Sequence, residues 1–583
     1  MNAALTRALF GADFDQVHEP WRRLFSSSTF HYREGLTPQE RTELSYARLR
    51  LVNKALADPE DLVTDVERLA ALHEWAGPVD PGLGTVASIH YNLFLGSLLD
   101  HDGARRDLRE FSELRRIGTF LCTEAAHGNS AAQLETTATY DPESGGFILH
   151  TPNPGARKWM PNTSSAGGPK TAVVAARLIT SDGADHGIFL FLTPLSDDEG
   201  NPLPGVTVRR LPQTTTAPVD HCATGFDHLR LPYEALLQAD HGRLAPDGTF
   251  TSSIGSPRKR FLSSIGRITT GKLCMSAYSL GTTRHALTIA VRHAYNRYTT
   301  GMTAGTSVPL FAHRSHHTPL LDALATTYAA TLLHRSTVSR WVHSDPAERD
   351  DVERLIAIAK GWITWRAREV MTECRERCGA QGLFLANGIA GQLVANEGTI
   401  TAEGDNLVIW VKAAGELLLG NFTPRPPGTR PAGERDLDDP EFLQDLLADT
   451  ERIWHQRART RLRAGKPGNR WNRTVTPALE LVDAHAHRLA AAALLTAAEQ
   501  AAHDEARHLL HHVHRLFVLR RVAAHSGDLL ADGRLTPDQV HRLPDVTEAV
   551  IDELEAHALT LTSAFGVSQD TLLDHPITTQ GSM

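Results

Sequence analysis

Apolar residues recur at helical spacing over the first hundred residues of the chain. The pattern runs from about Phe14 to Leu114. Within it, Thr37-Pro38-Gln39-Glu40 has the order of a capped helix start: a threonine N-cap, a proline at the first helical position and a glutamate at the third. The segment from Val86 to Leu99 is more uniformly apolar, which indicates a helix that lies against a core. We therefore predict a helical N-terminal part.

The period changes near Gly118, where short apolar runs replace the long helical pattern. Thr136 to Tyr140 and Phe147 to His150 flank the turn-rich segment Asp141-Pro142-Glu143-Ser144-Gly145-Gly146, an order typical of strand, turn and strand. Further short runs follow at 171–178, 187–192, 206–211 and 221–231. Turn residues separate them, so we predict a small antiparallel β domain.

Helical periodicity returns at about Phe261 and continues almost to the end. The predicted helices span about 261–298, 320–343, 350–377, 407–419, 436–464, 476–523 and 545–565. A proline-rich bridge, Thr423-Pro424-Arg425-Pro426-Pro427-Gly428, marks a boundary. The predicted fold class is α+β and mainly α. Its parts are an N-terminal helical domain at 1–116, a β domain at 117–235, a central helical bundle at 236–422, a linker at 423–435 and a C-terminal helical domain at 436–583.

Composition narrows the class of protein. The chain has 583 residues, of which 41% are hydrophobic and 22% charged, as in soluble globular proteins. A net charge of −9 argues against nucleic acid or an anionic membrane as partner. No apolar run reaches the roughly 18 to 20 residues that span a bilayer. The cysteines are odd in number and widely spaced, which predicts free thiols in a reducing compartment: Cys122, Cys222, Cys274, Cys374 and Cys378.

The first candidate for chemistry is the hexapeptide Thr401-Ala402-Glu403-Gly404-Asp405-Asn406. It lies between a glycine-punctuated loop, Asn387 to Gly398, and the apolar run Leu407 to Leu419. A carboxylate at the mouth of such a helix can serve as a positioned base, and the small residues beside Glu403 allow a ligand to approach the backbone. The alternative is a solvated loop whose Asp or Asn caps the next helix.

A second candidate precedes the β domain. The segment Thr123-Glu124-Ala125-Ala126-His127-Gly128-Asn129-Ser130 is small and polar, so its N–H groups and hydroxyls can hold a polar ring or a phosphate. By itself the segment is more typical of a structural loop.

Motifs in a fixed order connect these candidates. Thr123-Glu124 with His127-Gly128, the run Glu135 to Pro142, and Lys158-Trp159 resemble the β-domain signature of the acyl-CoA oxidases, flavin enzymes related to the acyl-CoA dehydrogenases. Cys378-Gly379-Ala380-Gln381-Gly382 is similar to that family's Cys-Gly-Gly-His-Gly loop, and Glu403-Gly404-Asp405-Asn406 to its Glu-Gly-Asp/Glu-Asn motif. The resemblance extends to Leu559–Phe565, in the family's additional C-terminal bundle.

The resemblance implies a reaction. In the family a carboxylate removes the α proton of an acyl-CoA thioester while the β hydride goes to FAD, and O2 reoxidises the flavin to give hydrogen peroxide. Glu403 matches the family's base. Its backbone N–H and a flavin hydroxyl would hold the thioester oxygen, because the developing enolate needs hydrogen bonds. Burial against the flavin is expected to raise the pKa of Glu403 towards neutrality.

The resemblance also implies cofactor contacts, with departures from the family pattern. The implied contacts are Thr123, Asn162, Arg297, Gly379, Gly382, Asp405 and Asn406. Asn162 replaces a family glycine in Lys158-Trp159-Met160-Pro161-Asn162-Thr163, and its side chain takes space. Arg297 matches an arginine that reaches the FAD of a partner subunit, which implies a homodimer. The aromatic residue that often follows falls near Thr300, and Leu383 also departs from the pattern.

Three alternatives remain open. The same desaturation can act on a biosynthetic acyl group carried by CoA or a carrier protein, as the departures at Met160, Asn162 and Leu383 suggest. A dehydrogenase would pass its electrons to a flavoprotein, although the domain after Pro427 argues against it. A protein that has lost its cofactor would keep the fold as a scaffold. Chain length, branching and carrier do not follow from the sequence.

Other features are assigned no function. His508 and His512 have a spacing that can bind zinc, but the His-Glu-x-x-His pattern is missing, so we assign no metal site. Ser256-Pro257-Arg258-Lys259-Arg260 can meet phosphates or be a solvated linker. Arginine outnumbers lysine by 51 to 8, which is typical of high-GC bacteria. The final Gln580-Gly581-Ser582-Met583 is not a peroxisomal signal, so we predict a cytoplasmic enzyme.

Overall fold

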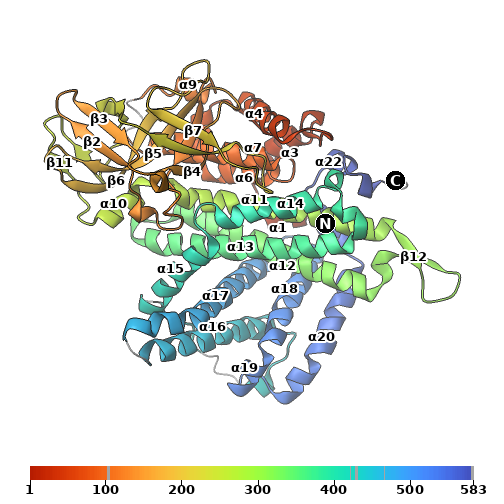
Figure 1. Cartoon of the computed structure of the whole chain (residues 1–583). Helices are drawn as coiled ribbons and strands as arrows, with labels where there is room; N and C mark the ends of the chain where they lie inside the picture. The colour runs from red at the N-terminus through yellow and green to blue at the C-terminus, as the bar shows by residue number, and fades with distance from the viewer. Residues whose placement is uncertain (102–105, 421, 427–430, 465–466, 580–583) are drawn as a thin grey trace. The chain divides into compact units, whose positions relative to one another are not determined.

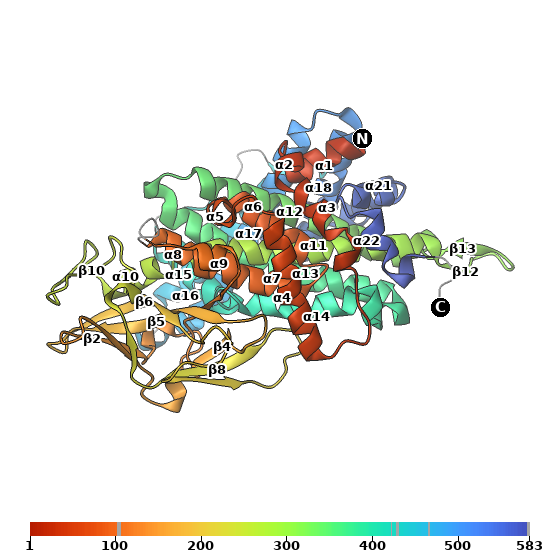
Figure 2. The same ribbon diagram turned by 90° about the horizontal axis from the view of Figure 1, so that it is seen from above.

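Two compact units make up the chain in the computed structural model, which describes residues 1–101, 106–420, 422–426, 431–464 and 467–579. The β-containing unit is Arg33–Cys274, and the helical unit joins Met1–Tyr32 to Met275–Met583. Helix α11 (Arg267–Asn296) begins in the first and continues into the second. Figures 1 and 2 show the elements of both units.

Short helices open the β-containing unit. They are α4 (Pro38–Lys54), α5 (Pro59–Thr64), α6 (Val66–Ala76), α7 (Pro81–Ala87), α8 (Gly96–Asp100) and α9 (Arg109–Ser112), with a π-helical stretch (Ser88–Leu95) between α7 and α8. Helix α10 (Pro257–Ser264) closes the unit. The predicted start of α4 is confirmed: Thr37 and Glu40 bond to each other's backbone N–H groups as a capping box. The apolar segment that begins at Val86 is helical and buried, as predicted.

The strands of this unit form two main sheets. They are β1 (Ile117–Leu121), β2 (Thr137–Asp141), β3 (Gly146–His150), β4 (Lys158–Asn162), β5 (Lys170–Ile179), β6 (Asp185–Pro194), β7 (Val206–Arg210), β8 (His221–Phe226), β9 (Leu229–Leu231), β10 (Arg243–Leu244) and β11 (Phe250–Thr251). The larger sheet has the order β1-β5-β2-β3-β9 with β6 on β5, and the smaller has the order β4-β8-β7. Their core is rich in aromatic residues, including Tyr140, Phe147, Phe189 and Phe191.

The β prediction needs one correction. The strands were expected to be antiparallel, but β1 and β2 each pair with β5 in parallel, so the larger sheet is mixed. A parallel pair needs a crossover connection rather than a hairpin, and local turn residues do not reveal such a connection. The sequence pattern does not predict strands β1, β4, β10 and β11.

The helical unit packs long helices around a shared core. Its helices are α1 (Asn2–Phe10), α2 (Phe14–Val17), α3 (Glu19–Phe25), α12 (Arg314–His343), α13 (Arg349–Arg377), α14 (Ile389–Thr401), α15 (Asn406–Leu419), α16 (Pro440–Arg463), α17 (Arg470–Gln500), α18 (Asp504–Ala524), α19 (Ser526–Ala531), α20 (Pro537–Glu555), α21 (Ala558–Ser563) and α22 (Gln569–Leu573). Helix α13 packs against α12, α14 and α15, and α17 against α16 and α18. A hairpin of β12 (Tyr298–Thr300) and β13 (Ser307–Pro309) projects from the end of α11 (Figure 1).

The glycine-punctuated segment before Glu403 is not a loop. It forms helix α14, which starts after Gly388 in a left-handed conformation, with φ of +77°. Glycines weaken isolated helices by about 1 kcal/mol each, but packing against α13 outweighs that preference here. Part of the predicted linker, residues 427–430, lies outside the described residues, as does the terminus at 580–583.

Two smaller predictions concern thiols and membranes. None of the five cysteines, all within the described ranges, forms a disulfide. Within those ranges, every helix is too short or too polar to cross a bilayer.

Candidate active site

Glu403 lies in a short turn between α14 and α15. Its side chain is half-buried, and its backbone is left-handed with φ of +58°. A residue with a Cβ pays about 1–2 kcal/mol for this conformation, so the surrounding structure must hold it there. Gly404 follows with φ of +98°, and a Cβ on it would lie 2.8 Å from Ile409 Cγ2. The turn thus fixes a carboxylate between two helices.

Asp405 and Asn406, predicted as cofactor contacts, have structural partners. Asp405 caps α15 by accepting a hydrogen bond from the backbone N–H of Leu407, at 3.0 Å. The Asn406 side chain is fully buried, and its Nδ2 donates to Thr364 Oγ1 at 2.8 Å. A side-chain contact from Asn406 to a cofactor would have to replace such a bond. The prediction for these two residues stays a prediction.

Lys360, on α13, is the residue beneath this turn that the sequence did not reveal. Its side chain has no exposed surface. Its Nζ donates to Ile400 O, Gly404 O and Asn406 Oδ1, each at 2.9 Å. One ammonium group therefore contacts the end of α14, the turn and the start of α15. A sequence signal exists: Lys360 is a single cation within the apolar run Leu355 to Trp362.

Gly379 and Gly382 shape the turn at the end of α13. Gly379 is left-handed, with φ of +56°. Gly382 has no room for a side chain, because a Cβ would lie 2.6 Å from Arg375 O. The turn then presents Leu383, Phe384 and Leu385, all half or more exposed. Both glycines have a conformational role, and their contact with a cofactor stays a prediction.

The C-terminal segment anchors the same turn. Asn387 donates to Gln381 O at 2.9 Å and accepts from the backbone N–H of Ile577 at 2.9 Å. His575 Nδ1 bonds to Ala386 O at 2.8 Å. Residues nearly 190 positions apart in sequence therefore hold the glycine turn in place.

Arg297 lies at the surface, just before the β12–β13 hairpin. Its side chain is exposed, and its backbone carbonyl accepts from the N–H of Leu310 at 2.8 Å. The hairpin carries exposed Tyr298 and Met302. This position is open to a partner, and the predicted contact with another subunit's cofactor stays a prediction.

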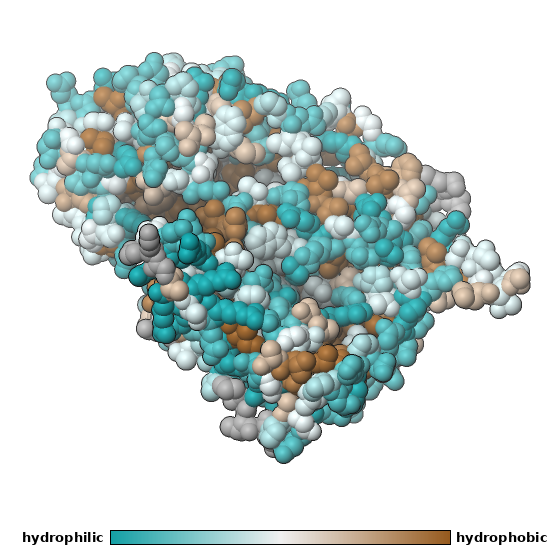
Figure 3. All heavy atoms as spheres, turned by 60° about the horizontal axis from the view of Figure 1, so that its bottom comes forward, coloured by the Kyte–Doolittle hydropathy of each residue, from teal (hydrophilic) through white to brown (hydrophobic). Residues whose placement is uncertain are grey.

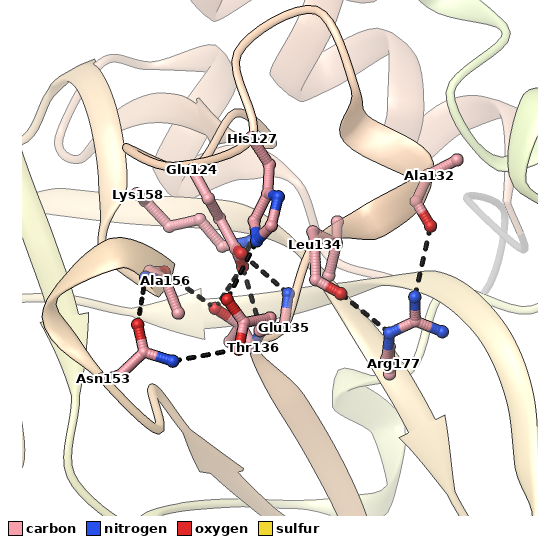
Figure 4. A network of polar contacts seen from close by, with 10 residues as sticks. All are labelled: Glu124, His127, Ala132, Leu134, Glu135, Thr136, Asn153, Ala156, Lys158 and Arg177. Atoms are coloured by element: carbon pink, nitrogen blue, oxygen red, sulfur yellow. Dashed lines mark hydrogen bonds and ion pairs between the residues drawn. The ribbon is translucent and has the colours of Figure 1, made fainter.

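In the β-containing unit, a buried ion pair supports the segment around Thr123 (Figure 4). Glu124 and Lys158 are both completely buried, and Lys158 Nζ lies 2.9 Å from Glu124 Oε1. Glu124 also accepts from the N–H of Glu135 at 2.7 Å, and from the N–H and hydroxyl of Thr136 at 2.9 and 2.6 Å. Burial alone would raise the pKa of Glu124. The Lys158 charge and these donors outweigh burial and hold that pKa below its ordinary value.

Thr123 itself is exposed on this support. Its carbonyl accepts from the N–H of Trp159 at 2.8 Å, which ties it to β4. Trp159 and Met160 expose apolar side chains next to it on β4, and Met160 has a left-handed backbone, with φ of +68°. This stretch therefore exposes one hydroxyl and two apolar side chains.

The Asn162 side chain points away from solvent. It is completely buried, and its Oδ1 accepts from Thr119 Oγ1 at 2.5 Å while its Nδ2 donates to Tyr46 OH at 3.0 Å. Tyr46 in turn donates to Asp220 at 2.6 Å. The side chain that replaces the family's glycine therefore fills space inside the unit. The left-handed residue of this stretch is Met160, not Asn162.

The structure also gathers histidines with carboxylates. His508 and His512 lie near Glu553, and His150 lies near Asp227 and His228, with potential ligand atoms within 4.8 Å of one another in each group. Most of these side chains are exposed. Asp227 and His228 already bond to each other at 2.7 Å.

Comparisons with known proteins agree over most of the chain. Residues 266–418 match the family model "Acyl-CoA oxidase, C-alpha1 domain", and residues 442–578 match the model "Acyl-CoA oxidase". Peroxisomal acyl-coenzyme A oxidase 2 of Arabidopsis thaliana is 28% identical over 559 residues, which cover 88% of this chain and 80% of that protein. Peroxisomal acyl-coenzyme A oxidase 1 of Bos taurus is 26% identical over 527 residues, covering 83% and 78%.

Solved structures share the fold. Acyl-CoA oxidase 3 of Yarrowia lipolytica has a TM-score of 0.87 at 22% identity and covers 100% of this chain and 89% of its own. Acyl-CoA oxidase-1 of Caenorhabditis elegans, complexed with FAD and ATP, has a TM-score of 0.86 at 20% identity and covers 99% and 90%.

Proposed function

The chain belongs to the acyl-CoA oxidase family, and we propose that it oxidises an acyl-CoA thioester to the trans-2-enoyl thioester with FAD as cofactor and O2 as final electron acceptor. The observation that carries the proposal is the turn at Glu403. The carboxylate-bearing residue has a left-handed backbone, and the next residue, Gly404, accepts a hydrogen bond from the buried Lys360. Strained backbone of this kind concentrates at active sites.

The residues present fit a flavin. A flavin ring needs an apolar surface with a few hydrogen-bonding groups at its edge. Thr123, Trp159 and Met160 provide an exposed hydroxyl and two exposed apolar side chains on one stretch of the β-containing unit. The Asn162 side chain is held inside by Thr119 and does not occupy this surface. This argues against a scaffold that has lost its cofactor.

The chain's own residues provide the base chemistry. The Glu403 carboxylate takes the α proton and becomes a carboxylic acid. The electrons of the broken Cα–H bond form the new double bond as a hydride leaves Cβ. The backbone N–H of Glu403 donates to the thioester oxygen, which makes the α proton more acidic. FAD, when bound, supplies the acceptor for the hydride and transfers the electrons to O2, giving hydrogen peroxide.

A homodimer is part of the proposal. The exposed apolar residues Leu383, Phe384 and Leu385 and the projecting β12–β13 hairpin offer the helical unit a surface for a second copy. Figure 3 shows hydrophobic side chains, in brown, reaching the surface among polar ones. Light scattering after gel filtration tests this, and a monomer at micromolar concentration would contradict it.

The test of function begins with the absorption spectrum of the purified protein. Anaerobic addition of acyl-CoAs of different chain length should bleach the flavin bands, and readmitted O2 should restore them with one hydrogen peroxide per enoyl product. Glu403→Gln should bind FAD but lose about 10²- to 10⁴-fold in bleaching rate. A colourless protein that FAD cannot reconstitute would refute the proposal.

The same experiment separates the alternatives. Bleaching by a carrier-loaded acyl group but not by plain acyl-CoAs would indicate a biosynthetic substrate. Bleached flavin that O2 restores only slowly would indicate a dehydrogenase. The cytoplasmic location stays a prediction, and cell fractionation tests it.

A further inference from the structure

Lys360 is an unusual residue for the interior of a helical bundle. Burying an ammonium group costs several kcal/mol unless its hydrogen bonds are replaced. Here three N–H groups meet three oxygen atoms, of Ile400, Gly404 and Asn406, all at 2.9 Å. Two of these oxygen atoms are backbone carbonyls, so the lysine bonds mainly to the main chain.

The position of Lys360 is itself fixed by close helix packing. Next to it, Gly361 allows Trp410 of α15 to approach α13, because a Cβ there would lie 2.1 Å from Trp410 Nε1. The same nitrogen donates to Ile358 O at 3.2 Å. Trp410 therefore fixes α15 against α13 at positions just before and just after Lys360.

Further hydrogen bonds fix Asn406, the side-chain acceptor of Lys360. Asn406 uses its Oδ1 for Lys360 and its Nδ2 for Thr364 Oγ1 and Gly361 O. Asn396, on α14, donates to Thr364 O at 3.0 Å. Three helices thus meet in one buried polar network, and such networks rigidify when every member is satisfied.

We infer that Lys360 is a positioning residue for Glu403, an inference that rests on the proposed function of Glu403 as the base. The bond to Gly404 O holds the peptide between Gly404 and Asp405, one peptide beyond Glu403. Together with the bond to Ile400 O, it brackets the turn on both sides. The bracket keeps Glu403 in its left-handed conformation and so directs the carboxylate and the backbone N–H towards one substrate.

The lysine also acts on the charge of the turn. A cation bonded to the residue after Glu403 favours the carboxylate over the carboxylic acid. A base must be unprotonated to work, so Lys360 extends the activity of Glu403 to lower pH.

The main test is Lys360→Met, which keeps the side-chain length but removes the donors and the charge. The matched control is Lys412→Met, an exposed lysine on α15 that pairs with Glu416. We expect K360M to keep FAD and to lose about 10- to 100-fold in kcat, because small displacements of a catalytic group have effects of this size. The acidic limb of its pH profile should move to higher pH. K412M should resemble wild type in both.

Two readouts separate positioning from general damage. A thioester with α protons but no β protons, such as 3,3-dimethylbutyryl-CoA, can exchange its α protons with D2O but cannot be oxidised. The exchange rate at saturating thioester reports the base alone, and it should fall in K360M. Backbone amide exchange across 402–406 should rise in K360M without added substrate, because the turn has lost its bracket.

The outcomes are distinct. K360M with wild-type exchange, kcat and pH limb would overturn the inference while leaving the proposed function intact. A K360M defect explained entirely by lost FAD would also overturn it. Wild-type protein that neither exchanges α protons nor turns over would refute the proposed function and this inference together. If K360M does not fold, Lys360→Gln shortens the side chain and removes the charge, which weakens the bonds to Ile400 O and Gly404 O, and unchanged α-proton exchange in that variant would refute the bracket.

Discussion

The buried ion pair of the β-containing unit gives a stability prediction that can be worked from its geometry. Lys158 Nζ lies 2.9 Å from Glu124 Oε1, and both side chains are completely buried. At an effective dielectric constant of 20, two charges at that distance attract by about 6 kcal/mol. Lys158→Met leaves the carboxylate with its three other donors, from Glu135 and Thr136. We expect the free energy of unfolding to fall by about 3 kcal/mol, the lower end of the usual range for a broken buried ion pair.

The pH dependence follows from the same pair. In the native protein the lowered pKa of Glu124 contributes stability above about pH 4.5, which is lost as pH falls through the folded pKa. In K158M the attraction is gone and burial raises the pKa of Glu124. The deficit of K158M should therefore be largest near pH 8 and should shrink as the carboxylate takes up a proton at lower pH.

Calorimetry is the appropriate assay, because two units need not melt together. Three kcal/mol corresponds to a fall of about 6–12 °C in the transition of a unit of this size. Lys259→Met, at an exposed position on α10, is the matched control. The double variant E124Q/K158M should recover part of the loss, since it leaves no buried charge. A K158M transition within 2 °C of wild type, or a deficit that grows on acidification, would refute the reasoning.

Three further predictions follow from other parts of the structure. Burial lowers the pKa of His285 and of His514 to about 3, so below about pH 6.5 the unfolded chain binds protons that the native protein does not. Each of these two histidines should therefore lower the free energy of unfolding by about 1.4 kcal/mol per pH unit below about 6.5. An unchanged melting temperature between pH 7 and pH 5 would contradict this. Asn162→Gly restores the family's residue but removes two side-chain hydrogen bonds, so it should lower stability by about 1–3 kcal/mol without tightening FAD binding; a titration showing much tighter binding would mean that the asparagine obstructs the cofactor. His575→Ala removes the bond to Ala386 and should speed amide exchange in the turn at 379–388, measured by mass spectrometry, whereas exchange confined to the C-terminal segment would show that the turn holds itself.

The elements that the sequence predicted well are those whose signals are local. The capping box at Thr37 and the hairpin of β2 and β3 depend on residues within a few positions of one another, and the structure has both. The sequence predicts a loop where helix α14 forms, because its glycines oppose a helix locally, while the packing that stabilises the helix comes from α13. The parallel pairing of β1 with β5 joins residues about fifty positions apart, which no local pattern records.

The candidate site divides in the same way. Glu403 can be proposed from the sequence because its motif is contiguous. Lys360 and the Lys158–Glu124 pair were missed as parts of the site, because a lysine is normally an exposed residue and only tertiary packing reveals that these two are buried. The inward direction of Asn162 depends on Thr119 and Tyr46, which lie far from it in sequence.

The helical unit is discontinuous in sequence, so the order of synthesis affects when its parts can pack together. Residues 33–274 form a compact unit that can fold on the ribosome as soon as they emerge. The first helix must wait, because Thr6 donates to Ala564 O and both belong to the other unit. The glycine turn also waits, because its anchors at His575 and Ile577 are translated almost 200 residues after it. During synthesis, residues 33–274 would therefore be folded while the N-terminal helices still lack their packing partners. A chaperone that shields α1 until the C-terminal helices emerge would favour correct assembly.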